Sequence, residues 1–560
     1  MLLKLLEVIV NYFDYFLKDR EAVSKEFNDI FSELNKNVNK YYCGKPILSG
    51  EIKKYNEILL DKHISENGLM LSKVLADFST LFQRAVIWEH PGTMINITPP
   101  ANLISIAASA YTSLYNPNFA QDESSGYLMA TELIVAKYLS ELVDWNYKKA
   151  RGIFTFGGKA TNMYAVKIGL KKAIPDSIQN GISNQKIVVF STEKSHPCHS
   201  EICDWLGIGK KSCEKIKVLD NGMIDIDFLE KRLRYSIENG ISIGCIIVNG
   251  GTTNEIIIDP IKKVVELRDR LVKEYNLSYI PHIHVDSVIG WAWLFFKKYD
   301  FEKNSLNMSN SEIKKIKSMK NKISEIKYAD SFGADFHKTG FCPYVSSIFM
   351  AHDFNDVTGL GNKKDKGIDN LSFGEYSPFE YTLELTRSSA GPVSAYIAME
   401  LFGIKGFQKL LYNLFTNCEY IRECLDNHNS FEVINKETEG IATLFVVLPN
   451  NEKMYNDYII SSEKIINNFV EYNYQFYLFC LHLLENEKVH FKITFSKSYK
   501  PFNCEYKTGA LKIYPMSPIV EKNEIKKYID EIIFAKEEFD KSTQNLEDKR
   551  DIPIDYVYRN

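Results

Sequence analysis

The stretch 330–349, DSFGADFHKTGFCPYVSSIF, contains a single lysine, Lys338, which directly follows His337 and is surrounded by aromatic and small residues. Burial disfavours an ammonium group, and a neutral lysine amine can form a Schiff base with a carbonyl compound. Most lysines are solvated surface groups. The stretch alone therefore leaves a surface role open, and the neighbouring segments have to decide between the two.

A strand, a turn and a helix follow one another in GIFTFGGKATNMYAVKIGL (152–170). Gly157 and Gly158 allow a tight turn and close approach of a ligand to the backbone, and the helix from about Thr161 offers unpaired amides to an anion. This order is that of a phosphate cup. A plain strand-to-helix turn is the alternative, because two glycines before a helix are a weak signal.

A histidine follows the next predicted strand, KIVVF (186–190), in the segment SHPCHSEICDWLGIG. His196 stands just beyond the carboxyl end of that strand, which is where open α/β sheets place their ligands. A surface loop histidine is the alternative. His199 and Cys198 nearby suggest a metal, but no second group of ligands accompanies them at a usual spacing, so we predict no metal site.

Two further buried strands are predicted, GCIIVN (244–249), which leads into Gly-Gly-Thr-Thr (250–253), and YIPHIHVD (279–286), which ends on Asp286. A buried aspartate at a strand tip needs a cationic partner or several hydrogen-bond donors. A protonated pyridine nitrogen would satisfy it. His284 is either the residue that orients Asp286 or only a strand residue.

Taken in order, the Gly-Gly cup, the strand-tip histidine, the GTT turn, the strand ending in HVD and the final HK resemble the group II pyridoxal-phosphate-dependent amino-acid decarboxylases. The resemblance covers about residues 90–406. GGKATNMYAVKIGL is similar to the glutamate enzymes, and the spacing from His196 to LGIG is that of the glutamate, tyrosine and aromatic amino-acid decarboxylases. The cofactor that the resemblance implies is pyridoxal 5'-phosphate.

The resemblance also implies roles for individual residues. Lys338 is the Schiff-base lysine, Asp286 the partner of the pyridine nitrogen, and His196 the residue that stacks on the cofactor ring. Thr253 lies near His196 and the substrate carboxylate. The cofactor phosphate is held by Gly158, Lys159, Ala160 and His337.

The substrate side of the predicted site is less well marked. Family members protonate the carbanion from a tyrosine on a mobile loop, and we predict Tyr376 for this role, with Tyr381 second. The segment from His90 to Met94, with Thr93 inside it, and the loop before Arg387 should contact the substrate. Lys512 is the only basic residue where many members have an arginine for the α-carboxylate, and a lysine lacks the bidentate fork.

Pattern and resemblance together predict an α/β fold of type I, with a mostly parallel seven-stranded sheet between two layers of helices. We expect a helical amino-terminal arm over 1–88, a cofactor-binding large domain over 89–402 and a small α/β domain over 403–560. A Lys-rich stretch at 298–327 is predicted as a surface insertion with one charged helix, since it has little apolar surface. The arm either packs on its own chain or wraps around a second copy.

Composition excludes several classes of protein. With a formal net charge of -4 the 560-residue chain offers no reason to expect nucleic acid or an anionic membrane as a partner. Its ten cysteines include no CxxC pair, which is typical of a reduced, cytoplasmic protein. The apolar start, residues 1–20, is interrupted by Lys4, Glu7 and Asp14, and predicts an amphipathic helix instead of a signal peptide or a membrane span.

The function that follows is removal of the α-carboxylate of an acidic or aromatic L-amino acid, giving an amine and carbon dioxide. Three alternatives stay open: a carbon-carbon lyase on the same scaffold, an aldehyde synthase that couples decarboxylation to oxidative deamination, and a cofactor-binding homologue without turnover. Family members are dimers with their sites at the subunit interface, so the resemblance implies a homodimer.

Overall fold

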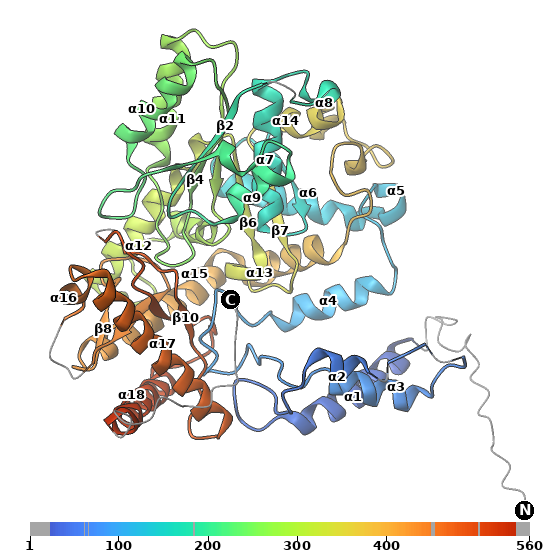
Figure 1. Ribbon diagram of the computed structural model, residues 1–560. Helices are drawn as coiled ribbons and strands as arrows, with labels where there is room; N and C mark the ends of the chain where they lie inside the picture. Colours follow the sequence, from blue (N-terminus) through green and yellow to red (C-terminus); the bar gives the residue numbers. More distant parts are fainter. Residues whose placement is uncertain are drawn as a thin grey trace, which may run out of the picture.

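The computed structural model describes residues 23–544 except 61, 65, 183–184, 450–453 and 502–503, and the predicted amphipathic start lies outside this part. Two sheets organise the described residues, and a long helix joins them (Figure 1). The larger sheet has seven strands in the order β1-β7-β6-β5-β4-β2-β3. Strand β7 runs antiparallel to both of its neighbours, and the other pairings are parallel. This confirms the predicted mostly parallel, seven-stranded sheet. The strands are β1 (Arg151–Thr155), β2 (Ile187–Thr192), β3 (Cys213–Ile216), β4 (Ser242–Asn249), β5 (His282–Asp286), β6 (Ser331–Asp335) and β7 (Ser347–Ala351).

Both faces of the large sheet are covered, because alternate residues of its buried strands enter two different cores. In β2, for example, Phe190 belongs to one cluster and Val189 to the other. Helices α7 (Gly158–Ala173), α9 (Cys198–Trp205) and α14 (Asn355–Thr358) pack on the smaller cluster. The larger cluster is covered by α6 (Ala130–Leu142), α10 (Ile226–Glu238), α11 (Ile261–Glu274), α12 (Asn310–Ile323) and α15 (Ala390–Asp426).

The small sheet, in the order β10-β11-β9-β8, packs against two long helices, α17 (Glu463–Glu485) and α18 (Lys522–Gln544). Its strands are β8 (Phe431–Val433), β9 (Thr443–Val447), β10 (Thr494–Ser496) and β11 (Ala510–Ile513). Helix α15 joins the two sheets: Leu411 is buried in the core of the large sheet and Ile421 in that of the small one. Gly403 interrupts this helix with a φ of 53°. The domain division that we propose after residue 402 falls at this kink.

The amino-terminal arm consists of α1 (Val23–Val38), α2 (Tyr55–Leu59) and α3 (Leu71–Thr80), which lie together beside the body of the chain (Figure 1). Several of its large apolar side chains are exposed, among them Phe31, Leu60 and Leu81. Arg84 forms an ion pair with Glu485 of α17, which ties the end of the arm to the small sheet. Shorter helices complete the chain: α4 (Leu103–Ser113), α5 (Asp122–Ser125), α8 (Ser177–Asn180), α13 (Phe336–Thr339) and α16 (Tyr455–Ile459).

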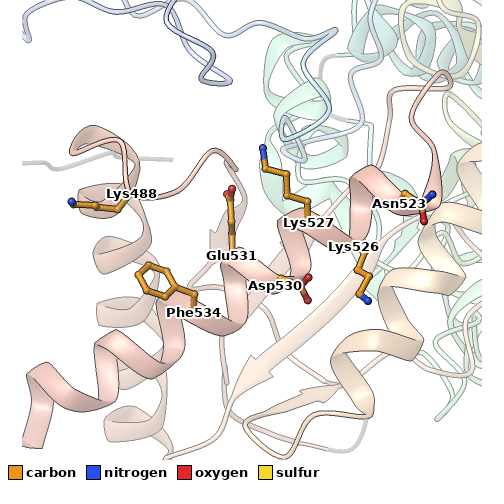
Figure 2. A pocket seen from close by; sticks show the side chains of 7 residues that line it. All are labelled: Lys488, Asn523, Lys526, Lys527, Asp530, Glu531 and Phe534. Carbon is orange, nitrogen blue, oxygen red and sulfur yellow. The ribbon is translucent and has the colours of Figure 1, made fainter.

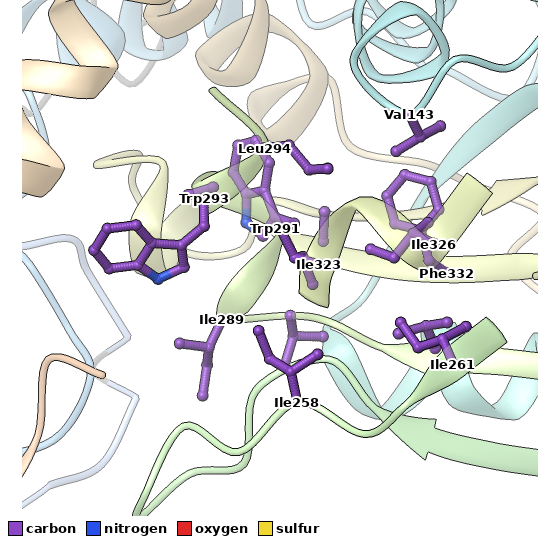
Figure 3. Packing of buried hydrophobic residues seen from close by; sticks show 14 of the residues in the cluster. Val143, Ile258, Ile261, Ile289, Trp291, Trp293, Leu294, Ile323, Ile326 and Phe332 are labelled. Carbon is purple, nitrogen blue, oxygen red and sulfur yellow. The ribbon is translucent and has the colours of Figure 1, made fainter. Parts of the chain in front are cut away.

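The Lys-rich stretch is part of the core, contrary to the prediction of a surface insertion. Its helix, α12, buries Ile316, Met319 and Ile323 completely, and Ile326 follows them into the main cluster beside Phe332 (Figure 3). The apolar positions recur every three or four residues, so one face of the helix packs although the mean composition is polar.

Replacing Ile316 with alanine is therefore expected to destabilise the chain by about 2–5 kcal/mol, because a filled core site becomes a cavity. A lower midpoint of thermal or urea unfolding would show the loss. Lys314→Ala, on the exposed face of the same helix, is the matched control and should change stability by about 0.5 kcal/mol or less. Equal effects of the two substitutions would contradict the packing of α12.

Candidate active site

A cavity of about 200 Å³ opens where β4, β5 and β6 end, beside the start of α7. Polar and charged groups from all of these elements face it. Parallel strands bring their carboxyl ends to one edge of a sheet, which explains why segments far apart in the sequence meet here. The lining residues are Gly158, Lys159, Asn162, His196, Cys198, Asn249, Gly251, Thr252, Thr253, Asp286, Val288, Ile289, Asp335, His337, Lys338 and Tyr344.

Lys338 points its amine at Asp335, the last residue of β6, with 3.1 Å between Nζ and Oδ2. His337 Nε2 lies 3.4 Å from the same oxygen, and the Ser347 hydroxyl donates to the other oxygen at 2.6 Å. Burial alone would lower the pKa of Lys338, but the Asp335 carboxylate, together with Asp286 and Tyr344, raises that pKa by more, so the net shift is upward. The neighbouring carboxylates thus favour the charged form of this amine, opposite to the effect that an apolar setting alone would have.

Asp286 is the last residue of β5, and its carboxylate is held by a histidine of α9. His199 Nε2 lies 3.1 Å from Oδ2, while Oδ1 is buried without a hydrogen-bond partner among the described residues. Burial alone would raise the pKa of Asp286, yet the hydrogen bond from His199 and the positive charges nearby bring it well below its usual value. His284, the other candidate for orienting Asp286, contacts Ser331 through Nδ1 instead. Asp286 is therefore an ionised carboxylate with one oxygen free for a cation.

The Gly-Gly turn brings backbone to the cavity. Gly157 has a φ of 133°, a conformation that side-chain-bearing residues rarely adopt. A Cβ added at Gly158 would lie 3.0 Å from an Asp335 oxygen, a tight contact that only a shift of that carboxylate would relieve. Ala160 does not line the cavity, and its amide donates to Gly157. Lys159 does line it, but its amine pairs with Glu201 of α9 at 2.6 Å.

His196 and Thr253 line the same cavity, as the resemblance predicts. The His196 Nδ1 accepts a hydrogen bond from the Cys198 amide at 3.2 Å, which fixes the ring relative to α9. The carbonyl of Thr253 accepts one from the Tyr514 hydroxyl at 3.1 Å, so the small sheet holds the loop after β4. The two side chains are thus positioned by different parts of the fold.

The residues predicted to bind substrate, His90, Thr93, Arg387 and Lys512, do not line this cavity. Two of them have hydrogen-bond partners elsewhere: the His90 ring contacts the Gly44 carbonyl, and the Thr93 hydroxyl donates to the Ile87 carbonyl. Burial lowers the pKa of Lys512, and the nearby Glu255 carboxylate opposes this shift only in part. The cavity of a single chain therefore offers none of these four to a substrate.

Arg387 and Tyr376 meet instead at a buried carboxylate, Glu132 of α6. The Tyr376 hydroxyl donates to Glu132 at 2.9 Å, and the Arg387 guanidinium forms an ion pair with it. Tyr376 is nearly fully buried and does not line the cavity. Tyr381 also lies outside it, and among the described residues the tyrosine that lines the cavity is Tyr344.

Sequence reasoning missed several lining residues, of which Asp335 and Asn249 matter most. Both end buried strands, so the rule that ligands gather at strand ends would have found them. Asn249 joins the strand ends to each other: its side chain donates to Thr192 and Asp259 and accepts from Ser195, each at 2.9 Å.

A larger hollow, of about 630 Å³, lies on α18 and contains no comparable chemistry (Figure 2). Its side chains come from α18 and Lys488, and all but Glu531 are exposed. Elsewhere in the described part of the chain, no group of three or more histidine, cysteine or acidic side chains could hold a metal ion. No described helix is long and apolar enough to cross a membrane.

Known proteins share this sequence pattern and this fold. Acidic amino acid decarboxylase GADL1 of Xenopus tropicalis is 27% identical over 254 residues, which are 45% of this chain and 48% of the relative. The matched part thus spans about half the length of that curated relative. Mouse CSAD superposes with a TM-score of 0.75 at 18% identity, over 92% of this chain and 99% of the other. Rhodiola rosea 4-hydroxyphenylacetaldehyde synthase superposes with a TM-score of 0.70 at 12% sequence identity, over 93% of this chain and 99% of the other.

The two superpositions, at identities this low, show the fold. The family follows from the sequence: the family model described as the pyridoxal-dependent decarboxylase conserved domain matches residues 53–446, well over half of the chain. This match includes every residue that lines the cavity. The protein therefore belongs to the pyridoxal-dependent decarboxylase family.

Proposed function

We propose that this protein is a pyridoxal-phosphate-dependent carboxy-lyase that removes the α-carboxylate of an acidic or aromatic L-amino acid to give an amine and carbon dioxide. One observation carries the proposal. Lys338, Asp286 and Gly158 at the start of α7 line a single cavity. These are an amine, an anion and a backbone anion site, which are the groups that such a cofactor needs.

The residues present fit pyridoxal phosphate. Asp286 Oδ1 is a buried acceptor without a partner among the described residues, which is costly unless a ligand pairs with it. A protonated ring nitrogen supplies such a partner. Gly158 lines the cavity at the positive amino-terminal end of a 16-residue helix, α7, which is a favourable place for a phosphate. His337 lines the same cavity from α13.

Each residue then has a distinct task. When bound, the cofactor supplies a cationic ring that accepts the electron pair released as the carboxylate leaves. Asp286 keeps that ring protonated, and Lys338 provides the amine that holds the cofactor covalently. Before attachment the Lys338 ammonium must release a proton, and Asp335 at 3.1 Å is the nearest carboxylate. His196 and Thr253 orient the substrate over the ring.

We also propose that the protein acts as a homodimer with its sites at the interface. Helix α4 exposes Leu103 and Tyr111 at 74% and 60%, and Tyr127 nearby is 80% exposed. Together with the exposed apolar side chains of the arm, these residues form exposed apolar surface of the kind that marks protein–protein contacts. Sedimentation of the full chain should give twice the mass of one chain. A single-chain mass at micromolar concentration would rule the dimer out.

A cytoplasmic location is proposed on the cysteines. All ten are free thiols, and nine of them are at least partly buried. Free buried thiols are usual where glutathione keeps proteins reduced.

A release assay tests the proposed function. The full chain, purified with pyridoxal phosphate, is expected to show a visible absorbance band and to release carbon dioxide from one or two of the standard amino acids. Stoichiometric amine would support the carboxy-lyase. Aldehyde with consumption of oxygen would favour the synthase instead, a reaction for which the Rhodiola rosea relative is named. If the absorbance band appears but no amino acid yields carbon dioxide, the remaining alternatives are a carbon-carbon lyase and a cofactor-binding homologue without turnover.

A further inference from the structure

His199 is a buried histidine for which the proposed chemistry has no direct use. Its ring is completely buried on α9, and Nε2 lies 3.1 Å from Asp286 Oδ2. The other ring nitrogen, Nδ1, is buried and has no hydrogen-bond partner among the described residues. The Asp286 hydrogen bond is thus the only polar contact of this side chain within the described residues.

A histidine so placed engages one oxygen of Asp286 and leaves the other for a ligand. The Nε2–H donates to Oδ2, whereas Oδ1 has no hydrogen-bond partner among the described residues. Two other side chains near Asp286 are engaged elsewhere: the Lys338 amine lies at Asp335, and His284 contacts Ser331. His199 is therefore the one side chain among the described residues that holds Asp286 by a hydrogen bond.

We propose that His199 is a positioning residue, which holds the Asp286 carboxylate in place for the ring nitrogen of the cofactor. The proposal rests on the proposed function, since it assigns the partner of Asp286. His199 does not itself touch the cofactor. Its contribution should appear only when the bound ring carries a nitrogen that Asp286 can pair with.

The test compares two ligands on the full-length cofactor-free chain. One is pyridoxal phosphate, and the other is its analogue with a C–H group in place of the ring nitrogen. Dissociation constants come from fluorescence titration of wild type, His199→Phe and His199→Met, which remove the donor, and His199→Gln, which retains an N–H at a similar reach. His282→Gln is the matched control, because His282 is equally buried on β5 but contacts Ser331 and Lys172.

His199→Phe and His199→Met are expected to weaken pyridoxal phosphate about 10- to 100-fold, the scale of one lost hydrogen bond to a charged group. The same variants should bind the C–H analogue as wild type does, and His199→Gln should recover most of the loss. The ratio of the two constants is taken within each variant, so partial unfolding cancels. His282→Gln should leave the ratio unchanged.

Two results would overturn the inference. If the donor-free variants bind pyridoxal phosphate as tightly as wild type, His199 does not position Asp286. If they lose the same factor for both ligands, His199 only supports the packing of α9. The proposed function fails in a different way: wild type would then bind pyridoxal phosphate no better than the C–H analogue, or not at all.

Discussion

Replacing Lys338 with alanine is expected to abolish the visible absorbance band of the purified protein and to reduce amine release by about three orders of magnitude or more. Removal of a group that forms a covalent bond in the reaction has effects of this size in other enzymes. Lys338 is the lysine whose amine lies inside the cavity beside Asp335 at 3.1 Å. Absorbance spectra and amine quantification of wild type and variant measure both effects.

Lys338→Arg separates covalent attachment from charge. Arginine keeps a cation for Asp335, which is 1% exposed, but cannot form the bond to the cofactor, because it does not deprotonate in proteins. It should therefore preserve the unfolding temperature better than Lys338→Ala and still lack the band. A variant of either kind that keeps both band and activity would place the reactive lysine elsewhere.

Breaking the ion pair between Arg387 and Glu132 should destabilise the chain strongly, because both residues are buried. Glu132 is completely buried, and besides Arg387 it accepts from the Phe154 amide at 2.7 Å and the Tyr376 hydroxyl at 2.9 Å. Arg387→Met leaves this carboxylate without its cation, at an expected cost of about 3–5 kcal/mol in the free energy of unfolding. Urea unfolding followed by circular dichroism measures it.

The double variant Arg387→Met with Glu132→Gln provides the control, because neither residue is then a buried charge. It should recover much of the lost stability, as replaced buried pairs often do. If the double variant is as unstable as the sum of the single ones, the two residues do not act as a pair. A normal stability of Arg387→Met alone would show that Glu132 is not a buried anion.

The site residues that could be predicted from the sequence are those whose positions depend on the strand directly before them. Lys338, Asp286, His196 and Gly158 stand at strand ends or in the turn after one, and the parallel sheet brings such positions together whatever the rest of the chain does. Predicting the sheet was therefore enough to predict that they meet.

Long-range partners could not be predicted in the same way. Nothing near Arg387 in the sequence shows that its partner is Glu132, 255 positions earlier and on another helix. Likewise the spacing of His284 and Asp286 on one strand suggested a contact, whereas tertiary packing of α9 brings His199 to the carboxylate. Composition gave a wrong prediction for α12, because the helix is polar on average although three of its side chains are fully buried.

The hydrogen bond from the Tyr514 hydroxyl to the Thr253 carbonyl connects the small sheet to the loop that lines the cavity. Tyr514 directly follows β11, and Thr253 directly follows two other lining residues, Gly251 and Thr252. A substitution that removes the Tyr514 hydroxyl would therefore act on this loop, although Tyr514 itself does not line the cavity. The carboxyl-terminal part of the chain supports the wall of the cavity without contributing a lining residue to it.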